Sequence, residues 1–203
     1  MTLQTPTLQR DVIILSAINS MLSTIGQAPV NSLSSGLVDA ETAEVILDEV
    51  SRDVQAMGWN FNSELNFEVV PDADGHIVLP TEVVRADAVT KYRRIVSDFV
   101  QRSNKMYDLR NHTYVIGRPL KLDVIVLLPF EQLPEVARRF ITVKASRLFQ
   151  ERVVGSDTLS AMNRADEDKA FYALKEMEGD NGDYNIFDDY GTAEALNRSI
   201  GQG

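Results

Sequence analysis

Carboxylates are the side chains in this sequence best suited to chemistry. Asp188 and Asp189 are adjacent near the end of the chain, and Asp166 and Glu167 form a second group. Pairs of acids about 5 Å apart, or about 6.5–9.5 Å apart, can hydrolyse a glycosidic bond. Aromatic rings that could stack on a sugar stand beside the first pair: Tyr184, Phe187 and Tyr190. One hypothesis is therefore a glycoside hydrolase that uses paired carboxylates. Because a chain with 30 acids forms such groups by chance, the pattern favours a solvated acidic tail or a docking surface.

Other catalytic and ligand-binding patterns are missing from the sequence. There is no cysteine, which excludes disulfides, thiolate metal sites and thiol catalysis. The glycine-rich phosphate loops, the GxSxG nucleophile turn and the HExxH zinc motif are all absent. The two histidines, His76 and His112, fall in predicted turns and have no partner at metal-ligand spacing. We therefore predict no metal and no cofactor.

Length and composition are those of an ordinary globular domain. With 203 residues and 44% hydrophobic content, the chain can bury a sizeable core as one domain, or as one domain with a large insertion. No apolar run approaches the ~20 residues of a membrane span, and the first residues lack a basic-then-apolar leader. We expect no membrane span and synthesis in the cytoplasm.

Charge is divided unevenly along the chain. Residues 1–84 hold 2 basic and 12 acidic side chains, residues 85–152 hold 14 and 7, and residues 153–203 hold 4 and 11. A basic block between acidic ones is typical of a nucleic-acid surface or of subunits that meet positive to negative, but solvated faces give the same pattern. No reader motif is present, so any DNA binding would not be sequence-specific.

The region around residues 133–155 is predicted to be the central helix of a bundle. Pro134 suits the start of a helix, Gly155 suits its end, and apolar residues occupy most of the circumference between them. Basic side chains are scattered among these apolar residues, and we expect them to pair with the acidic segments within one subunit or across to the next: Arg138, Arg139, Arg147 and Arg152.

Three further helices and a β insertion complete the predicted fold, an α+β chain. The helices are expected at residues 11–25, 39–57 and 156–178. Short β-branched and aromatic segments between turn residues predict mostly antiparallel strands at 67–71, 76–80, 83–89, 92–96, 105–109, 113–117 and 120–128. Residues 122–128 of the last strand are the most apolar and should be the most buried. Trp59 and Phe61 should plug the core beside the turn at Gly58.

This pattern predicts four segments of the chain. Residues 1–65 supply the first two helices of an antiparallel bundle of about four helices, and residues 66–130 form the inserted β domain. Residues 131–179 supply the last two helices. Residues 180–203 are acidic and rich in glycine, and we expect an extended, flexible tail that orders only against a partner.

Four segments resemble one family of phage proteins. The sequences LSAINSMLSTIGQAPVNSL, ILDEVSRDVQAMGWNFN, LPEVARRFITVKASRLFQERVVGS and GDYNIFDDYG, in this order, resemble the tail tubular protein A family of short-tailed podoviruses of the Autographiviridae type. They correspond to that family's first helix and turn, second helix, central helix and C-terminal tail, and they are spread over almost the whole chain.

The resemblance implies a structural role as head–tail connector, adaptor and gatekeeper in the virion tail. Copies would form a dodecameric ring below the portal protein, join it to the nozzle protein (tail tubular protein B) and seat the tail fibre. Double-stranded DNA would leave through the lumen without sequence-specific binding. The isolated chain would be a monomer if ring closure needs the portal. The arginines of residues 133–155 and the aromatic residues of the tail are the expected assembly contacts. The alternative is a carbohydrate hydrolase acting on host surface polysaccharide, alone or as a second activity of the tail protein.

Overall fold

The chain forms two compact units. The computed structural model describes residues 6–89, 98–155 and 157–183. The described parts of Met1–Val50 and Leu133–Gly203 make one unit, and those of Ser51–Gln132 make the other. We call them the helical unit and the β unit. Four helices packed together and a small antiparallel sheet inserted between them in the sequence confirm the predicted α+β class.

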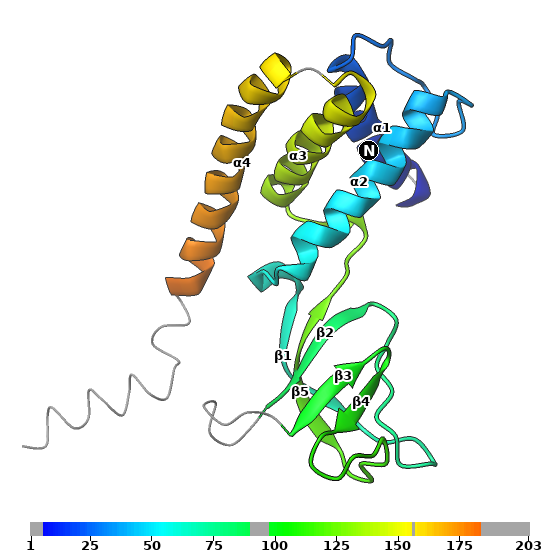
Figure 1. Ribbon diagram of the computed structural model, residues 1–203, viewed down its shortest axis with the longest axis vertical. Helices are drawn as coiled ribbons and strands as arrows, with labels where there is room; N and C mark the ends of the chain where they lie inside the picture. Colours follow the sequence, from blue (N-terminus) through cyan, green and yellow to red (C-terminus); the bar gives the residue numbers. More distant parts are fainter. Residues whose placement is uncertain (1–5, 90–97, 156, 184–203) are drawn as a thin grey trace, which may run out of the picture. The chain divides into compact units, whose positions relative to one another are not determined.

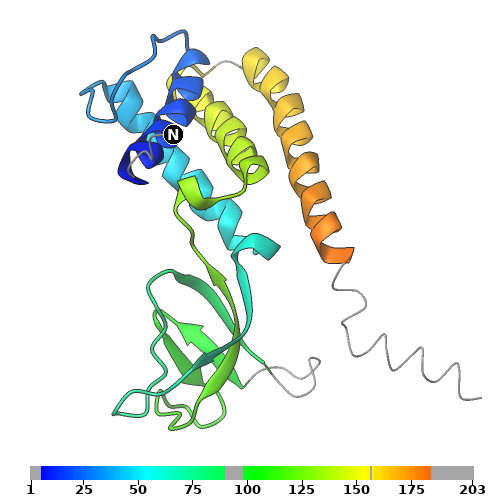
Figure 2. The same cartoon turned by 180° about the vertical axis from the view of Figure 1, so that it is seen from behind.

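The helical unit is built from α1 (Pro6–Ser23), the first part of α2 (Val38–Ala56), α3 (Glu135–Val153) and α4 (Asp157–Asp183). Helix α3 packs against both α1 and α4, and α4 runs antiparallel beside it (Figures 1 and 2). The prediction of a central helix is therefore confirmed.

The apolar residues of α3 explain its central position. Ile141 and Phe149 are fully buried, and Phe140 contacts Phe171 of α4 with ring centroids 5.2 Å apart. At the far end of the helix, Gln150 Nε2 donates a hydrogen bond to the carbonyl of Thr24, just after α1. A helix with apolar residues around most of its circumference can bury more than one side, and α3 does so.

The ends of α3 lie close to the predicted positions. Pro134 precedes the first helical residue, and its carbonyl accepts a hydrogen bond from the amide of Arg138 at 3.0 Å. Gly155 follows the helix with a φ of +67°, which glycine adopts at little cost. Helix α4 is longer than predicted, because it continues to Asp183 through residues assigned to the tail.

The β unit contains a three-stranded antiparallel sheet and a separate hairpin. The strands β1 (Ser63–Val69), β5 (Leu120–Val126) and β2 (Val83–Ala88) lie side by side in this order. The hairpin pairs β3 (Phe99–Arg102) with β4 (Lys105–Asp108). Strand β5 is central and largely buried, as predicted. The buried side chains of one cluster fill the unit: Ile77, Leu79, Val83, Ala86, Met106, Leu120, Leu122 and Val124.

Two predicted strands are wrong. Residues 76–80 and 113–117 form no ladder and make only isolated bridges, which include His76 with Val115 and Val78 with Lys105. The hairpin strand β3 was not predicted, and the segment 92–96 lies outside the described residues. Each of these segments has the β-branched and aromatic composition of a strand, but neither pairs with a neighbouring strand along its length.

Buried hydrogen bonds join the end of α2 and the residues after it to the end of β5. Asn62 is 3% exposed, donates to the carbonyls of Gln55 and Val126, and accepts from the amide of Trp59. Gln55 in turn exchanges two hydrogen bonds with the backbone of Leu128. Trp59 is 8% exposed, donates its indole N–H to the carbonyl of Val54 and is stacked with Phe61, so its predicted core position is confirmed.

Candidate assembly surfaces

Arg147 connects α3 to α4 within the helical unit. Its guanidinium binds Glu167 of α4 at 2.5 Å and Glu151 of its own helix at 2.9 Å, and its side chain is 15% exposed. The hydrogen bonds that Arg147 donates to Glu167 and, to a smaller extent, to Glu151 raise the pKa of Arg147 above its ordinary value, against the effect of partial burial. The basic side chain thus pairs with an acid of the last charge segment inside one subunit.

Arg152 makes the corresponding contact to the first charge segment. Its two terminal nitrogens bind the two carboxylate oxygens of Glu49 on α2, at 2.8 and 3.0 Å. This bidentate geometry is the favoured one for arginine with a carboxylate. The hydrogen bond from Arg152 lowers the pKa of Glu49. Both side chains are about half exposed, so the pair is open to solvent and salt.

The remaining residues predicted for assembly lie elsewhere. Arg138 binds Glu135 one turn earlier on α3, and Arg139 is exposed. The aromatic residues predicted for the tail contact are outside the described residues: Tyr184, Phe187 and Tyr190. Asp188 and Asp189, the first acid pair proposed for hydrolysis, are also outside them.

The second acid pair is described, and each of its members binds a cation. Glu167 binds Arg147, as above, and Asp166 accepts a hydrogen bond from Lys169 at 3.1 Å on the exposed side of α4. Paired hydrolytic acids need one carboxyl that can protonate a leaving group and another free to attack or to activate water. With Glu167 bound to an arginine, this pair lacks that arrangement.

His76 lies closer to acids than the sequence suggested. The ligand atoms of Asp72, Asp74 and His76 are within 4.8 Å of one another, so the prediction that His76 has no partner at metal-ligand spacing is wrong. The carboxylate of Asp72 accepts from the backbone amides of Asp74 and His76, which lowers its pKa, with the His76 amide contributing most. Lys105 Nζ lies 3.5 Å from His76 Nδ1, where it would repel a cation. The group is therefore best described as a turn in which the Asp72 side chain accepts hydrogen bonds from the turn's own backbone.

The outer side of the hairpin and its bridged neighbours forms one surface. Residues opposite each other in antiparallel strands share a face, which places Arg102, Lys105 and Val78 in one row and Val100 and Tyr107 in the next. We call this surface the hairpin face; it also includes His76 and Val115, which bridge each other. The alternate residues Ile77 and Met106 are fully buried behind it.

The hairpin face combines cations with apolar and aromatic side chains. The Arg102 guanidinium lies 3.7 Å from the centroid of the Tyr107 ring, and Tyr107 meets Tyr114 edge to face at 4.8 Å. Val78 is 39% exposed and Val115 is 55% exposed. Sequence reasoning located the basic block but missed this face. The signal was present in the alternation Ile77–Val78–Leu79, whose outer member is apolar.

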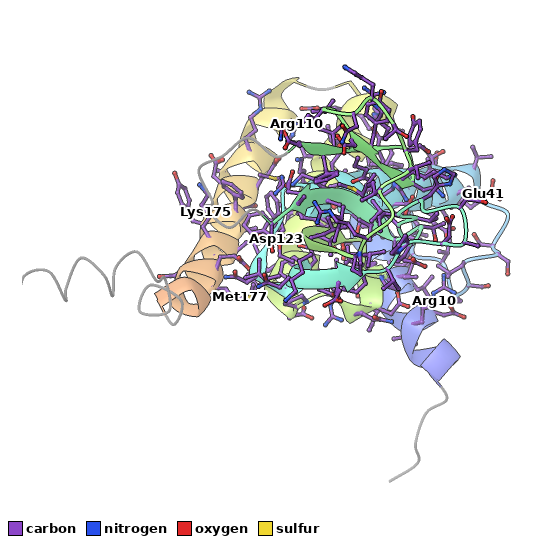
Figure 3. The ribbon with its side chains drawn as sticks, turned by 90° about the horizontal axis from the view of Figure 1, so that it is seen from below. Arg10, Glu41, Arg110, Asp123, Lys175 and Met177 are labelled. Atoms are coloured by element: carbon purple, nitrogen blue, oxygen red, sulfur yellow. The ribbon has the colours of Figure 1, made fainter. Side chains whose placement is uncertain are left out.

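The outer side of α2 carries the opposite charge. Residues at helical spacing form an exposed stripe, which we call the α2 stripe: Val38, Glu41, Glu44, Val45 and Asp48. Val38 and Val45 are 71% and 66% exposed. Figure 3 shows Glu41 pointing away from the helix into solvent. Within the described part of the chain, the three acids of the stripe make no ion pair, in contrast to the neighbouring Glu49.

Comparison with known proteins places the chain in a family. The family model described as tail tubular protein matches residues 15–184, which covers most of both units. The chain belongs to the tail tubular protein family. It is 30% identical over 128 residues to tail tubular protein A of Klebsiella phage KP34, and the match covers 63% of this chain and 66% of that protein. The chain thus spans slightly less than two thirds of that relative's length.

Membership identifies the chain as a structural component of a phage tail, located in the virion tail. This confirms the family that the sequence resembles. Among the described helices, none is both long enough and apolar enough to cross a membrane.

Proposed function

We propose that this tail tubular protein is the subunit of a ring that joins the portal protein to the nozzle protein, tail tubular protein B. The ring forms part of the DNA ejection channel and provides a seat for the tail fibre. Dodecamers form in the virion, and the isolated chain is monomeric when no portal is present as a template.

The observation that carries this proposal is the extent of the family match. It spans residues 15–184 and so includes the helical unit and the β unit together. A match of this extent supports a role that uses the whole chain, as an adaptor between two different partners does, more than a role confined to one local site.

The charge distribution supports a ring. Surfaces of opposite sign on one subunit allow a head-to-tail contact in which each copy offers one surface to each neighbour, and such contacts close into rings. The net charge of −10 also suits a channel for DNA. Every phosphate bound by a basic wall would hold the polymer back, whereas acidic walls let it pass.

The residues predicted for assembly divide into two groups under this proposal. Arg147 and Arg152 brace the helical unit through Glu167 and Glu49, so they support the ring contact from within the subunit. The exposed Arg139 and the tail residues reach neighbours or partners: Tyr184, Phe187 and Tyr190.

Order-of-addition sedimentation tests the proposal. Purified portal rings, this protein and the nozzle protein are mixed pairwise and together, and complexes are separated on a gradient. We expect the protein to sediment with portal rings, and the nozzle protein to join only when both are present. Failure of the protein to sediment with portal rings, or direct binding of the nozzle protein to the portal alone, would overturn it.

A further inference from the structure

We propose that the hairpin face of one copy binds the α2 stripe of the next copy, which makes these two surfaces the ring contact of this chain. The inference rests on the proposed ring, and it names the residues through which neighbouring copies meet.

The hairpin face has the residue composition of a protein–protein interface. Arg102 and Lys105 supply positive charge, and Arg102 is already oriented by the Tyr107 ring. Arginine and tyrosine are among the side chains most enriched where protein partners bind. Asp72 lies at the edge of this face as an anion whose carboxylate accepts from the amides of its own turn, so the face carries two cations beside one acid.

The α2 stripe offers the complementary features. Glu41, Glu44 and Asp48 are exposed and supply negative charge, while Val38 and Val45 lie between them as apolar contacts. Exposed single valines are common on protein surfaces. Two on one stripe, flanked by acids that make no ion pair among the described residues, indicate a surface that is covered in the assembly.

The α2 stripe is long enough to cross the hairpin face. The stripe runs over residues 38–48 and is about 16 Å long, at about 1.5 Å per residue. The hairpin face is three segments wide, made of β3, β4 and residues 76–78, because residues 113–115 bridge both Asp108 of β4 and His76. At about 4.8 Å between neighbours, its width is about 10 Å. A helix laid across this face places its valines over the valines and tyrosines and its acids beside the cations.

A contact between these two surfaces is heterologous by construction. Each copy carries both surfaces, and each surface binds a different neighbour, which is the arrangement that builds a ring. Apolar contacts would supply most of the affinity, and the charges would select the partner and the register.

Charge exchange tests the contact. The hairpin variant carries Arg102→Glu and Lys105→Glu, and the α2 variant carries Glu44→Lys and Asp48→Lys. Ring formation on portal rings is measured by sedimentation, and folding is checked by circular dichroism and Trp59 fluorescence. A matched control, Asp168→Lys with Glu176→Lys, makes the same charge change as the α2 variant at exposed positions of α4.

We expect each variant alone to lose at least about tenfold in assembly, because like charges then face each other. An equal mixture of the two variants should recover assembly in part, because contacts between the two variants again join opposite charges, whereas contacts between copies of the same variant do not. A chain that carries all four substitutions should recover assembly fully, because every contact then again joins opposite charges. The control should assemble like the unaltered chain. Failure of the fourfold variant to assemble, while it remains folded, would overturn the pairing of these two surfaces.

Two further results would also count against this contact. If both variants assemble normally while the unaltered chain forms rings, the proposed ring stands and the contact is wrong. If deletion of residues 184–203 abolishes assembly and the α2 variant does not, the acidic tail of the neighbour is the occupant instead. If the unaltered chain does not join portal rings at all, the proposed function itself fails.

Discussion

The helical unit and the β unit use charge in different ways. In the helical unit, ion pairs connect different helices, through Arg147 with Glu167 and Arg152 with Glu49. In the β unit, the neutral amides of Gln55 and Asn62 bind backbone groups, and the buried carboxylate of Asp108 accepts from the amides of its own turn. Its cations on the hairpin face point outward, and Arg102 lies on an aromatic ring.

This difference shows which charges remain for binding. Two arginines of α3 stabilise the subunit itself, so they are poor choices for a contact between copies. The hairpin face and the α2 stripe carry charge beside exposed apolar side chains, outside these ion pairs. If each unit is stabilised in its own way, substitutions in the two units should differ in the size of their effects and in their response to salt.

The largest effect is expected from Asn62→Ala in the β unit. The change removes the Asn62 partner of the Trp59 amide and of the Val126 carbonyl, and one of the two donors to the Gln55 carbonyl, which still accepts from the Gly58 amide. At about 1–3 kcal/mol for each buried unsatisfied group, and with partial relaxation, the free energy of unfolding should fall by about 3 kcal/mol. Urea unfolding followed by Trp59 fluorescence measures it. The exposed amide variant Gln132→Ala should change it by less than about 0.5 kcal/mol, and equal effects would contradict this role.

The next effect is expected at Gly58, where α2 ends. It has a φ of +81°, and an added Cβ would lie 2.5 Å from Ile125 Cδ1. The left-handed conformation alone costs about 1–2 kcal/mol for other residues, so Gly58→Ala should cost about 2–3 kcal/mol once the contact is included. Gly117 has a φ of +66° with open space around it. Gly117→Ala should therefore show the backbone cost alone, and an equal loss at both positions would exclude a steric contribution from Ile125.

A smaller effect is expected from Arg147→Gln in the helical unit. Removal of the guanidinium takes away the cation that the partly buried Glu167 and Glu151 both bind. The cost should be about 1–2 kcal/mol, between the values for exposed and fully buried ion pairs. Hydrogen exchange of α4 amides should report it, because this pair joins α4 to α3. The exposed Arg139→Gln is the control, and unchanged exchange in α4 would remove the bracing role of Arg147.

The smallest expected effect is a difference between the two units in how their stability depends on pH and salt. The pKa of Glu49 is lowered by Arg152, and the pKa of Asp108 is lowered mainly by Asn111, a neutral partner. A carboxyl whose folded pKa is depressed stabilises the fold above its unfolded pKa, near about 4, and loses this contribution as the pH falls through the folded pKa. Both units should thus lose stability in acid.

Salt should then distinguish them. At about 1 M salt the Debye length is about 3 Å, so the exposed Glu49–Arg152 pair is screened while the Asp108 hydrogen bonds are not. We expect high salt to reduce the stability that the helical unit loses in acid and to leave the loss in the β unit unchanged. Glu49→Gln removes the titrating carboxyl of the helical unit, and Asp108→Asn removes that of the β unit. The stability of each variant is measured by melting curves at about pH 7 and about pH 3. Equal salt responses in both units would contradict the distinction.

The sequence predicted the helices better than the strands, for physical reasons. Periodic apolar residues and the glycines at 26, 58 and 155 give the helix ends within a few residues. Strands depend on distant partners, so residues 76–80 and 113–117 had strand composition without a ladder, and β3 was missed. The length of α4 was also missed, because Gly179 and Gly182 are residues that favour a tail over a helix.

The candidate surfaces were predicted only in part. Charge segmentation suggested that arginines of residues 133–155 meet the first and last segments, but no spacing in the sequence relates Arg152 to Glu49, 103 residues away. The exchange of hydrogen bonds between Gln55 and Leu128 was equally hidden. The hairpin face depends on bridges between segments that carry no pairing signal of their own, so only the structure brings its residues together.

The central claim is that this chain forms a ring between portal and nozzle. Electron micrographs of virion tails, averaged around the tail axis and labelled with an antibody fragment against this chain, test it most directly. We expect a closed ring of this chain seated between the portal density and the nozzle density. Label at any other level of the tail, or a direct junction of portal and nozzle without this chain, would contradict it.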